Sequence, residues 1–408
     1  MAYTDEAALR LMIEDQLELL RAMIAHNGAV LASPNGHYKA HWVRDGLYVL
    51  AGALYAGDSD LTRDLIRATF GIFHRHRAKI QEGIRRPPGK NYNYLHARYH
   101  PGHFDELEGE WGHNQFDMIG LFLYLVAKLP GRGIDPFRLG SHYEDKLLVN
   151  QMTRYLETLN WWRTADFGVW EEGPKQNASS LGSVLAGLQA VNELDDPYLY
   201  FKEAQLDKGR KALDKLLPDE SVGRECDLAQ LSLIWPYGVL NEEQTGTVLG
   251  RIEERLVRER GVIRYVGDGY YNAADERQIA TADSRTGLEL VDYREEDRES
   301  FPAKAEGSEA QWPLGLAWLS IVYSKLAKER HMRDAGYGEL KDKARECLEK
   351  LRGCAVPIPG KTVGCIPELY VDGRPNINTP LSWATAFAIV AAVAYSEIED
   401  RGVPYSVL

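Results

Sequence analysis

The sequence predicts an all-α protein in which six helical hairpins close into an (α/α)6 barrel of twelve helices. Helical periodicity dominates the 408 residues, and stretches with strand-like alternation are scarce. Helices that are apolar on nearly every face alternate with helices that are apolar on one face, six of each kind. A helix that is apolar all round has to be surrounded by protein, so the first kind is expected inside the ring and the second kind outside it.

The inner helices are expected where apolar residues cover the whole helical wheel, as in "GLYVLAGALYAG" and "LSWATAFAIVAAVAY". They are placed near residues 45–56, 116–129, 179–192, 226–236, 312–326 and 382–396. The outer helices carry charges at helical spacing, as in "DLTRDLIRATFGIFHRH". They are placed near residues 5–24, 60–76, 143–159, 198–217, 242–259 and 338–351.

The spacing of the apolar helices bears on whether the ring closes. They recur at roughly 50 to 80 residues, which suggests six copies of one helical hairpin. An open solenoid is the alternative, but it would usually show a more regular period and polar end caps. No shift in composition and no linker marks a second domain, so residues 1–408 are predicted to form one domain.

Four stretches depart from this pattern, and the first of them lies within the last. The segments "GVIRYVG" and "KTVGCIPELYV" are the main strand candidates. The basic run "FHRHRAKIQEGIRRPPGK" is expected to be a helix end followed by a loop. The stretch from Arg260 to Gly307 is too long for an ordinary connection, so a functional loop is expected there.

Composition and charge narrow the classes of function. A net charge of −12 argues against a nucleic-acid partner, because phosphate binding needs clustered Lys and Arg. No run of 18 apolar residues indicates a membrane span, and the start "MAYTDEAALR" lacks the regions of a signal peptide. Cys226, Cys347, Cys354 and Cys365 lack metal-ligand spacing and are expected to be reduced packing residues, which indicates a cytoplasmic protein.

The chemistry is expected at one end of the ring, where the loops that lead into the inner helices meet. Those loops are rich in acids, Arg, Trp and Tyr: "HYKAHWVRDG", "GEWGHNQFD", "FGVWEEGPKQN", "VGREC", "IRYVGDGYYN", "EGSEAQW" and "CIPELYVDGRPN". Aromatic faces under a sugar ring, with charged groups on its hydroxyls, are a common way to bind carbohydrate. The loops carry no phosphate-binding glycine motif and no histidine ligand pair, so a carbohydrate pocket without metal or cofactor is predicted.

Several motifs together resemble the glucoamylase family of glycoside hydrolases. They are, in chain order, "HYKAHWVRDGLYV", "WGHNQFDMIGLFLYL", "DFGVWEEGPKQNASSLG", "IRYVGDGYY", "EAQWPL" and "IPELY" with "LSWATA". They resemble even more the amylase-like domain of the phosphorylase kinase regulatory subunits, which belongs to the same superfamily. The resemblance covers about residues 20–395, and its members fold as six-hairpin α/α barrels. The helix alternation predicts the same fold independently.

The resemblance implies a catalytic role for two glutamates. Glu171, in Trp-Glu-Glu, matches the general acid of the family. Glu368, in Ile-Pro-Glu-Leu-Tyr, matches the general base that activates water. Many members carry an N-terminal β-sandwich or a starch-binding module, and neither is recognisable here, so short oligosaccharides are the expected substrates.

The resemblance also implies a set of substrate-binding residues. Arg44 and Asp45 match the pair that grips hydroxyls of the non-reducing-end glucose, and Arg264 matches an arginine of the first two subsites. Trp111 and Trp170 match aromatic residues that contact sugar. The remaining predicted contacts are Trp42, Glu172 and Glu309.

The pair of adjacent acids, Glu171 and Glu172, suggests how one carboxyl keeps its proton. An inverting glycosidase needs one protonated and one ionised carboxyl, about 6.5–9.5 Å apart. The apolar wall of Trp170 and a second negative charge would both raise the pKa of a neighbouring carboxyl. The sequence alone does not say which of the two glutamates is the acid; the resemblance selects Glu171.

Structural roles are the alternatives for several of these residues. Arg44 and Asp45 could form an ion pair at a helix start, where Asp caps well. His113, Gln115 and Asp117 could bind sugar or could only cap and pack.

Other side chains beside the inner helices could likewise have a structural role in place of a role in the pocket. Glu309 could bind sugar or cap the fifth inner helix. Trp312, Trp318 and Trp383 lie in or beside apolar helices and are expected in the core.

The expected activity is that of an exo-acting, inverting α-glucosidase that releases β-glucose from maltose-, isomaltose- or trehalose-type oligosaccharides. A catalytically silent sugar-binding or regulatory module, like the phosphorylase kinase subunits, is the main alternative. The presence of both carboxylates favours the enzyme. A sugar epimerase on the same fold would want paired histidines in the pocket, which are not evident. The oligomeric state is not indicated by the sequence.

Overall fold

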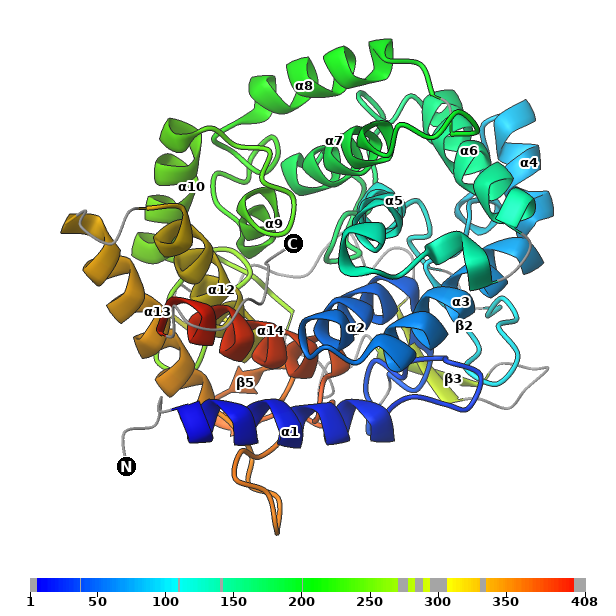
Figure 1. Cartoon of the computed structure of the whole chain (residues 1–408). Helices are drawn as coiled ribbons and strands as arrows, with labels where there is room; N and C mark the ends of the chain where they lie inside the picture. The colour runs from blue at the N-terminus through cyan, green and yellow to red at the C-terminus, as the bar shows by residue number, and fades with distance from the viewer. Residues whose placement is uncertain are drawn as a thin grey trace.

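In a computed structural model of the chain, a ring of inner helices is surrounded by a second layer of helices (Figure 1). The structure describes residues 6–36, 38–108, 111–139, 142–199, 201–270, 278–282, 289–293, 307–330 and 335–399. These ranges contain thirteen α-helices and three small two-stranded sheets. The predicted all-α barrel is confirmed.

The inner ring lies where the apolar segments predict it. It consists of α2 (Val43–Tyr55), α5 (Phe116–Lys128), α7 (Ala178–Glu193), α9 (Leu231–Ile234), α12 (Pro313–Glu329) and α14 (Ser382–Glu399). α9 is short because Pro236 follows it: proline lacks an N–H, and it disfavours helical geometry in the residue before it. α14 packs against both α12 and α2, so the last inner helix meets the first and the ring closes. This contact excludes the open solenoid.

The outer layer has one helix more than predicted. It consists of α1 (Glu6–Ala22), α3 (Ser59–Arg75), α4 (Arg77–Arg85), α6 (His142–Leu159), α8 (Ala204–Leu216), α10 (Glu242–Arg255) and α13 (Ala335–Gly353). The additional helix is α4, which the basic run after α3 forms in place of the expected loop.

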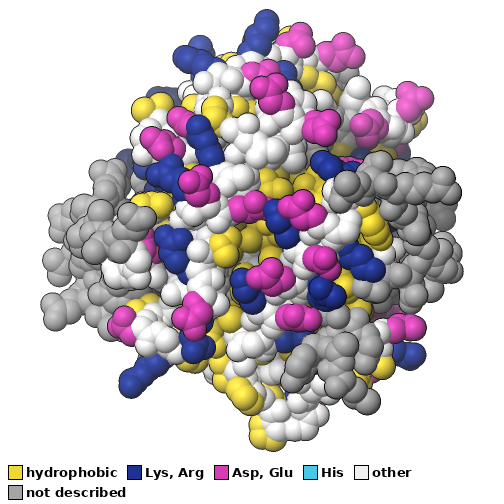
Figure 2. Space-filling view, turned by 90° about the vertical axis from the view of Figure 1, so that its left-hand side faces the viewer, with side chains coloured by type: hydrophobic (Ala, Val, Ile, Leu, Met, Phe, Trp, Pro, Cys, Tyr) yellow, Lys and Arg dark blue, Asp and Glu magenta, His cyan; other side chains and the backbone are white. Residues whose placement is uncertain are grey.

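The outer helices show the solvated charges that their amphipathic pattern predicts. The face of the molecule that carries α10 and α13 has acidic and basic side chains interspersed (Figure 2). Lys343 on α13 lies 3.2 Å from a carboxylate oxygen of Glu253 on α10. Exposed pairs of this kind contribute at most about 1 kcal/mol, so burial of the inner faces is what holds this layer in place.

The contact between α5 and α7 requires glycine. A Cβ added at Gly120 would lie 2.5 Å from the backbone carbon of Ser183, and one added at Gly187 would lie 2.5 Å from the carbonyl oxygen of Gly120. Both contacts involve backbone atoms, which have no rotamer to change. Any larger residue would therefore push these two inner helices apart.

The strand predictions are only partly right. Val262, in "GVIRYVG", forms isolated bridges with Val257 and Trp312 rather than a strand. In "KTVGCIPELYV", Cys365 forms an isolated bridge with Val356, and the end of the segment is β5 (Tyr370–Val371), which pairs with β6 (Arg374–Pro375).

The other two sheets are also small hairpins. β1 (His41–Trp42) pairs with β2 (Arg98–Tyr99), and β3 (Gln278–Ala282) pairs with β4 (Glu289–Tyr293). The predicted functional loop at 260–307 contains β3 and β4, and most of its other residues lie outside the described ranges. Among the helices that the structure describes, none is long and apolar enough to cross a bilayer.

Candidate active site

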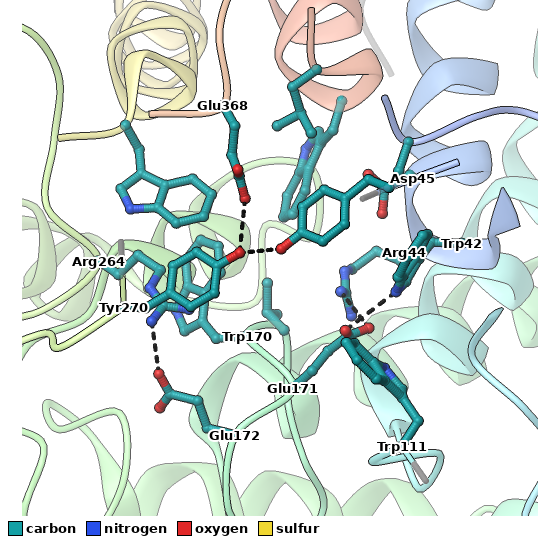
Figure 3. A pocket seen from close by; sticks show the side chains of 16 residues that line it. Trp42, Arg44, Asp45, Trp111, Trp170, Glu171, Glu172, Arg264, Tyr270 and Glu368 are labelled. Carbon is teal, nitrogen blue, oxygen red and sulfur yellow. Dashed lines mark hydrogen bonds and ion pairs between the residues drawn. The ribbon is translucent and has the colours of Figure 1, made fainter. Parts of the chain in front are cut away.

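The loops that lead into the inner helices meet at one end of the ring and enclose a pocket (Figure 3). The pocket contains about 780 Å³ of space, its open mouth included. Its walls come from the chain before α2, α5, α7, α12 and α14 and from the first turns of α2 and α14. The lining residues are Ala32, Tyr38, Trp42, Arg44, Asp45, Trp111, Val169, Trp170, Glu171, Glu172, Arg264, Tyr270, Trp312, Glu368, Leu381 and Trp383.

Nine of the ten predicted site residues lie in this lining. They are Trp42, Arg44, Asp45, Trp111, Trp170, Glu171, Glu172, Arg264 and Glu368. Arg44 and Glu368 are far apart in the sequence, and the closing contact between α2 and α14 brings their loops together. The structure therefore gathers these side chains in one place, while their roles in binding and catalysis stay predictions.

Glu171 occupies a strained turn before α7. Its φ is +59°, a left-handed conformation that residues other than glycine rarely adopt. Oε1 accepts hydrogen bonds from Arg44 Nη2 at 3.1 Å and Gln115 Nε2 at 3.0 Å, and Oε2 accepts one from Trp42 Nε1 at 3.2 Å. The side chains of Glu171 and Glu172 point away from each other (Figure 3). Backbone strain of this kind is typical of functional sites.

Glu172 is surrounded by positive charge. Its carboxylate accepts hydrogen bonds from Arg224 Nη2 at 2.7 Å, Arg264 Nη2 at 2.9 Å and the Tyr265 hydroxyl at 2.7 Å. Burial favours the neutral form, but the charges of Arg264 and Arg224 prevail and hold the pKa of Glu172 below its usual value. Two guanidinium groups compensate the charge of Glu172, and the left-handed turn separates its side chain from that of Glu171. This geometry argues against the predicted action of Glu172 on Glu171, which stays a prediction.

Glu368 is buried and firmly held. Asn376 Nδ2 and Asn378 Nδ2 both donate to its Oε2, the latter at 2.8 Å. The Tyr270 hydroxyl donates to Oε1 at 3.3 Å. In Figure 3, Glu368 and Glu171 reach into the pocket from different sides. The carboxyl groups of Glu171 and Glu368 thus belong to loops on different parts of the ring and face one pocket.

Arg44 and Asp45 lie in the first turn of α2 and are both buried. Arg44 Nη1 donates to Gln115 Oε1 at 2.8 Å and to Asp117 Oδ2 at 3.3 Å. Burial raises the pKa of Asp45 to about 7, even though the charge of Arg44 acts in the opposite direction. The N-cap residue of α2 is Trp42, so Asp45 does not cap this helix. The pair is therefore built into the pocket wall.

The decisive comparison is with protein families. The sequence profile described as "Glycosyl hydrolases family 15" matches residues 8–391 of this chain. The chain belongs to glycosyl hydrolases family 15. The resemblance to glucoamylases that the motifs indicate is thereby confirmed.

Individual relatives of this family 15 chain fall into two groups. The Caenorhabditis elegans protein described as "Probable phosphorylase b kinase regulatory subunit alpha" is 26% identical over 409 residues, which cover 87% of this chain and 30% of that protein. The chain therefore spans less than a third of that relative's length.

Solved structures form the second group. A glycosidase variant in complex with glucose aligns with a TM-score of 0.70 and 18% identity, over 96% of this chain and 99% of the other. A glucoamylase from Saccharomycopsis fibuligera aligns with a TM-score of 0.62 and 14% identity, over 97% and 96% of the two chains. At these identities the alignments establish the barrel fold alone.

Glu309 is the predicted site residue that this family 15 structure places outside the pocket lining. Its Oε1 accepts a hydrogen bond from the backbone N–H of Gly267 at 2.9 Å, and its Oε2 accepts one from that of Gly307 at 2.7 Å. It does not cap α12 either, whose N-cap is Trp312 without a side-chain cap bond. Glu309 therefore anchors the backbone on both sides of the long loop before α12.

His113, Gln115 and Asp117, for which sugar binding and packing were both open, have different surroundings. Gln115 and Asp117 both accept from Arg44, and Gln115 also donates to Glu171, so they orient residues of the pocket. His113 is buried and stacks on His96 with 3.6 Å between ring centroids, which is a packing role.

Sequence reasoning missed part of the aromatic lining. Trp318 is fully buried, as expected. Trp312 and Trp383 belong to the buried core as expected, and they line the pocket as well, which was not expected. Tyr38 and Tyr270 also line the pocket, and their hydroxyl groups are in contact. Their position in the sequence could have indicated this, because Trp312, Trp383, Tyr38 and Tyr270 all lie in a loop before an inner helix or at the start of one.

The asparagines that hold Glu368 and the arginine at position 224 were missed as well. Arg224 lies in the loop before α9, within a motif that the sequence had marked as pocket-facing. Cys226, Cys347, Cys354 and Cys365 are free and buried, as expected of packing residues. Within the described part of the chain, no group of three or more His, Cys, Asp and Glu side chains is arranged to hold a metal ion.

Proposed function

We propose that this family 15 protein is an exo-acting, inverting α-glucosidase that releases β-glucose from the non-reducing end of short α-gluco-oligosaccharides. One observation carries the proposal: Glu171 and Glu368 reach one pocket from different loops, with Arg44 and Asp45 in the wall beside them. A pair of carboxyl groups that flank a sugar site is the minimum equipment for glycoside hydrolysis.

In the proposed reaction, the two carboxyl groups act at the same time. Glu171 donates a proton to the glycosidic oxygen as the bond to the anomeric carbon breaks. Glu368 takes a proton from a water molecule as that water attacks the anomeric carbon from the opposite face. Attack from the opposite face inverts the anomer, so an α-linked substrate gives β-glucose. The mechanism requires the carboxyl groups to be about 6.5–9.5 Å apart, which leaves room for the water.

The other lining residues suit a glucose ring in the innermost position. Arg44 and Asp45 offer donors and acceptors to its hydroxyls, and a buried site of this kind rejects ligands that leave those groups unpaired. The ring faces of Trp170, Trp312 and Trp383 supply apolar walls. Binding of the sugar to Arg44 would compete with its bond to Glu171, which would free that carboxyl for the proton it has to carry.

The test is direct incubation with maltose, isomaltose and trehalose, followed by proton NMR of the product. The proposal expects the attacked anomeric carbon to become β in at least one of the three. Maltose or isomaltose then gives β-glucose in excess of the anomeric mixture of the leaving glucose, and trehalose gives equal amounts of α- and β-glucose. Before mutarotation, an excess of α-glucose from maltose or isomaltose, or α-glucose alone from trehalose, would indicate a retaining mechanism. That result would contradict the assignment of Glu368 as a base.

A regulatory, catalytically silent sugar-binding module is the second candidate. The observation that favours it is the similarity to phosphorylase kinase regulatory subunits, which extends over 87% of this chain. The two candidates differ in turnover. A silent module would bind glucose or maltose in calorimetry and would release no glucose from any of the three disaccharides.

A further inference from the structure

We propose that Asn376 and Asn378 are positioning residues for Glu368, which hold its Oε2 and leave Oε1 to take the proton from the attacking water. This inference rests on the proposed glucosidase function, in which Glu368 is the general base. Neither asparagine lines the pocket, so both would act through the carboxylate that they hold.

The backbone brings the two asparagines onto Glu368. The hairpin of β5 and β6 turns at Asp372 and Gly373, whose φ angles are +49° and +73°. A two-residue hairpin turn of type I′ requires positive φ at both positions, and Asp-Gly is among the sequences that adopt it most readily.

The returning strand is then tied back to the outgoing one. The N–H of Asn376 donates to the carbonyl of Leu369 at 3.1 Å, and the N–H of Glu368 donates to the carbonyl of Asn378 at 3.3 Å. Residues 376–378 follow β6 directly, and the chain bends at 377 and 378 while these two bonds hold it against the outgoing segment. The hairpin register therefore sets both amides beside the same carboxylate.

The two amides act on one oxygen. Asn376 Nδ2 and Asn378 Nδ2 both donate to Oε2 of Glu368, whereas the pocket residue Tyr270 donates to Oε1. Donors on a carboxylate favour its ionised form, which is the form that a general base needs. An amide donor also keeps its hydrogens at every working pH, so the arrangement stays the same across the activity profile.

The surrounding chain fixes the orientation of Asn378. This side chain is fully buried, and a Cβ added at Gly36 would lie 2.1 Å from its Oδ1. Gly36 has a φ of +63°, so glycine is favoured there on both counts. The loop around Gly36 thus closes over the amide and leaves its Nδ2 directed at Glu368.

The test compares Asn376→Ala and Asn376→Asp with the parent. Asn376 is partly exposed, so both variants are expected to fold. Loss of one donor to a charged carboxylate is expected to move the acid limb of the pH profile of kcat/KM upward by about one pH unit. The Asp variant puts a like charge beside the base and should move the limb further.

A matched control separates this effect from damage to the loop. Asn35 Nδ2 donates to the carbonyl of Thr379, beside the same segment, and does not touch Glu368. Asn35→Ala should leave the acid limb where it is in the parent. Among the described residues, the titratable groups Asp45 and Tyr270 interact with Glu368, and Tyr38 contacts Tyr270. Both Asn376 variants keep these three side chains.

The outcomes separate this inference from the proposed function. An active parent whose acid limb does not move in the folded Asn376 variants overturns the inference alone. Loss of folding in both variants shows a purely structural role and overturns it too. A parent that hydrolyses none of the three disaccharides overturns the proposed function and this inference together.

Discussion

The guanidinium group of Arg44 lies 3.1 Å from Oε1 of Glu171, and the same guanidinium lies 3.3 Å from Oδ2 of Asp117. The residue proposed to grip the sugar and the residue proposed as acid are thus one hydrogen-bonded unit. All three side chains are largely buried, so the interaction is only weakly screened by solvent.

Replacing Arg44 by Lys should lower kcat/KM by at least about 100-fold. Lysine carries a point charge on a flexible stem and lacks the planar fork that reaches Glu171, Gln115 and Asp117 together. The melting temperature should fall as well, because buried Asp117 loses a well-aligned partner. Arg67→Lys, in an exposed pair on α3, is the control and should change neither value. Parent-like kinetics in Arg44→Lys would contradict a role in the pocket.

The two proposed catalytic residues should respond differently to a substrate with a good leaving group. Glu171→Gln and Glu368→Gln should each lower kcat on the preferred disaccharide by about 10² to 10⁴ while sugar binding persists. A glucosyl fluoride needs little protonation, so the Glu171 variant should keep more activity on it than the Glu368 variant does. Equal losses on the fluoride would refute the assignment of acid and base.

Glu172→Gln should leave the alkaline limb of the pH–rate profile in its parental position. Arg224 and Arg264 already neutralise this carboxylate, so removing its charge changes little at Glu171. Stability should fall, because the two arginines lose a charged acceptor, worth about 1.5–3 kcal/mol for each hydrogen bond. Urea unfolding and a pH series of kcat measure the two effects. A downward shift of the alkaline limb would instead support the hypothesis that the charge of Glu172 raises the pKa of Glu171.

Asp166 should make the protein less stable as the pH rises. Burial, together with the charge of Asp117, raises the pKa of Asp166 to about 7 in the folded protein, against 3.8 for an unperturbed aspartate. The folded state therefore binds more protons between about pH 4 and pH 7. The stabilising contribution is full below this window and is lost as the pH rises through it, at up to about 1.4 kcal/mol per pH unit.

Urea unfolding between pH 5 and pH 8 measures this dependence. Asp166→Asn should flatten the decline, while part of the slope should persist because Asp45 is also raised to about 7. Asp60→Asn, on the exposed face of α3, is the control. A slope that Asp166→Asn leaves unchanged would contradict the assignment.

The sequence predicts the ring and the pocket lining well for a definite reason. Inner and outer helices differ in how many faces are apolar. This difference can be recognised from the residues of each helix alone, without knowledge of the rest of the fold. Glu171, Glu368 and Arg44 were found because their loops keep recognisable motifs beside helix starts. The extra helix α4 was missed because its mean composition is polar and basic, which fits a loop as well as a solvated helix.

Side-chain direction is what the sequence could not give. The Glu171–Glu172 pair looks like two neighbouring charges, and only the left-handed φ of Glu171 sends them apart. Glu309 looks like another acid of the pocket, and its use by two backbone N–H groups depends on a loop path that no periodicity encodes. Asn376 and Asn378 follow a recognisable Asp-Gly turn. Their common target, Glu368, lies before β5 on the opposite arm of the hairpin, and the sequence does not show that the two arms bring these side chains together.

The contact between α14 and α2 that closes the ring can form only late in synthesis, because α14 is the last helix of the barrel to be made. During synthesis α2 emerges about 330 residues before α14 begins, which corresponds to roughly 15 to 65 seconds at ordinary translation rates. Throughout that interval, the apolar face of α2 that packs against α14 in the folded protein has no partner. The loop that carries Glu368 is likewise not yet in place beside Arg44. The nascent chain therefore exposes apolar helix surface until α14 docks, and the pocket is among the last parts of the molecule to form.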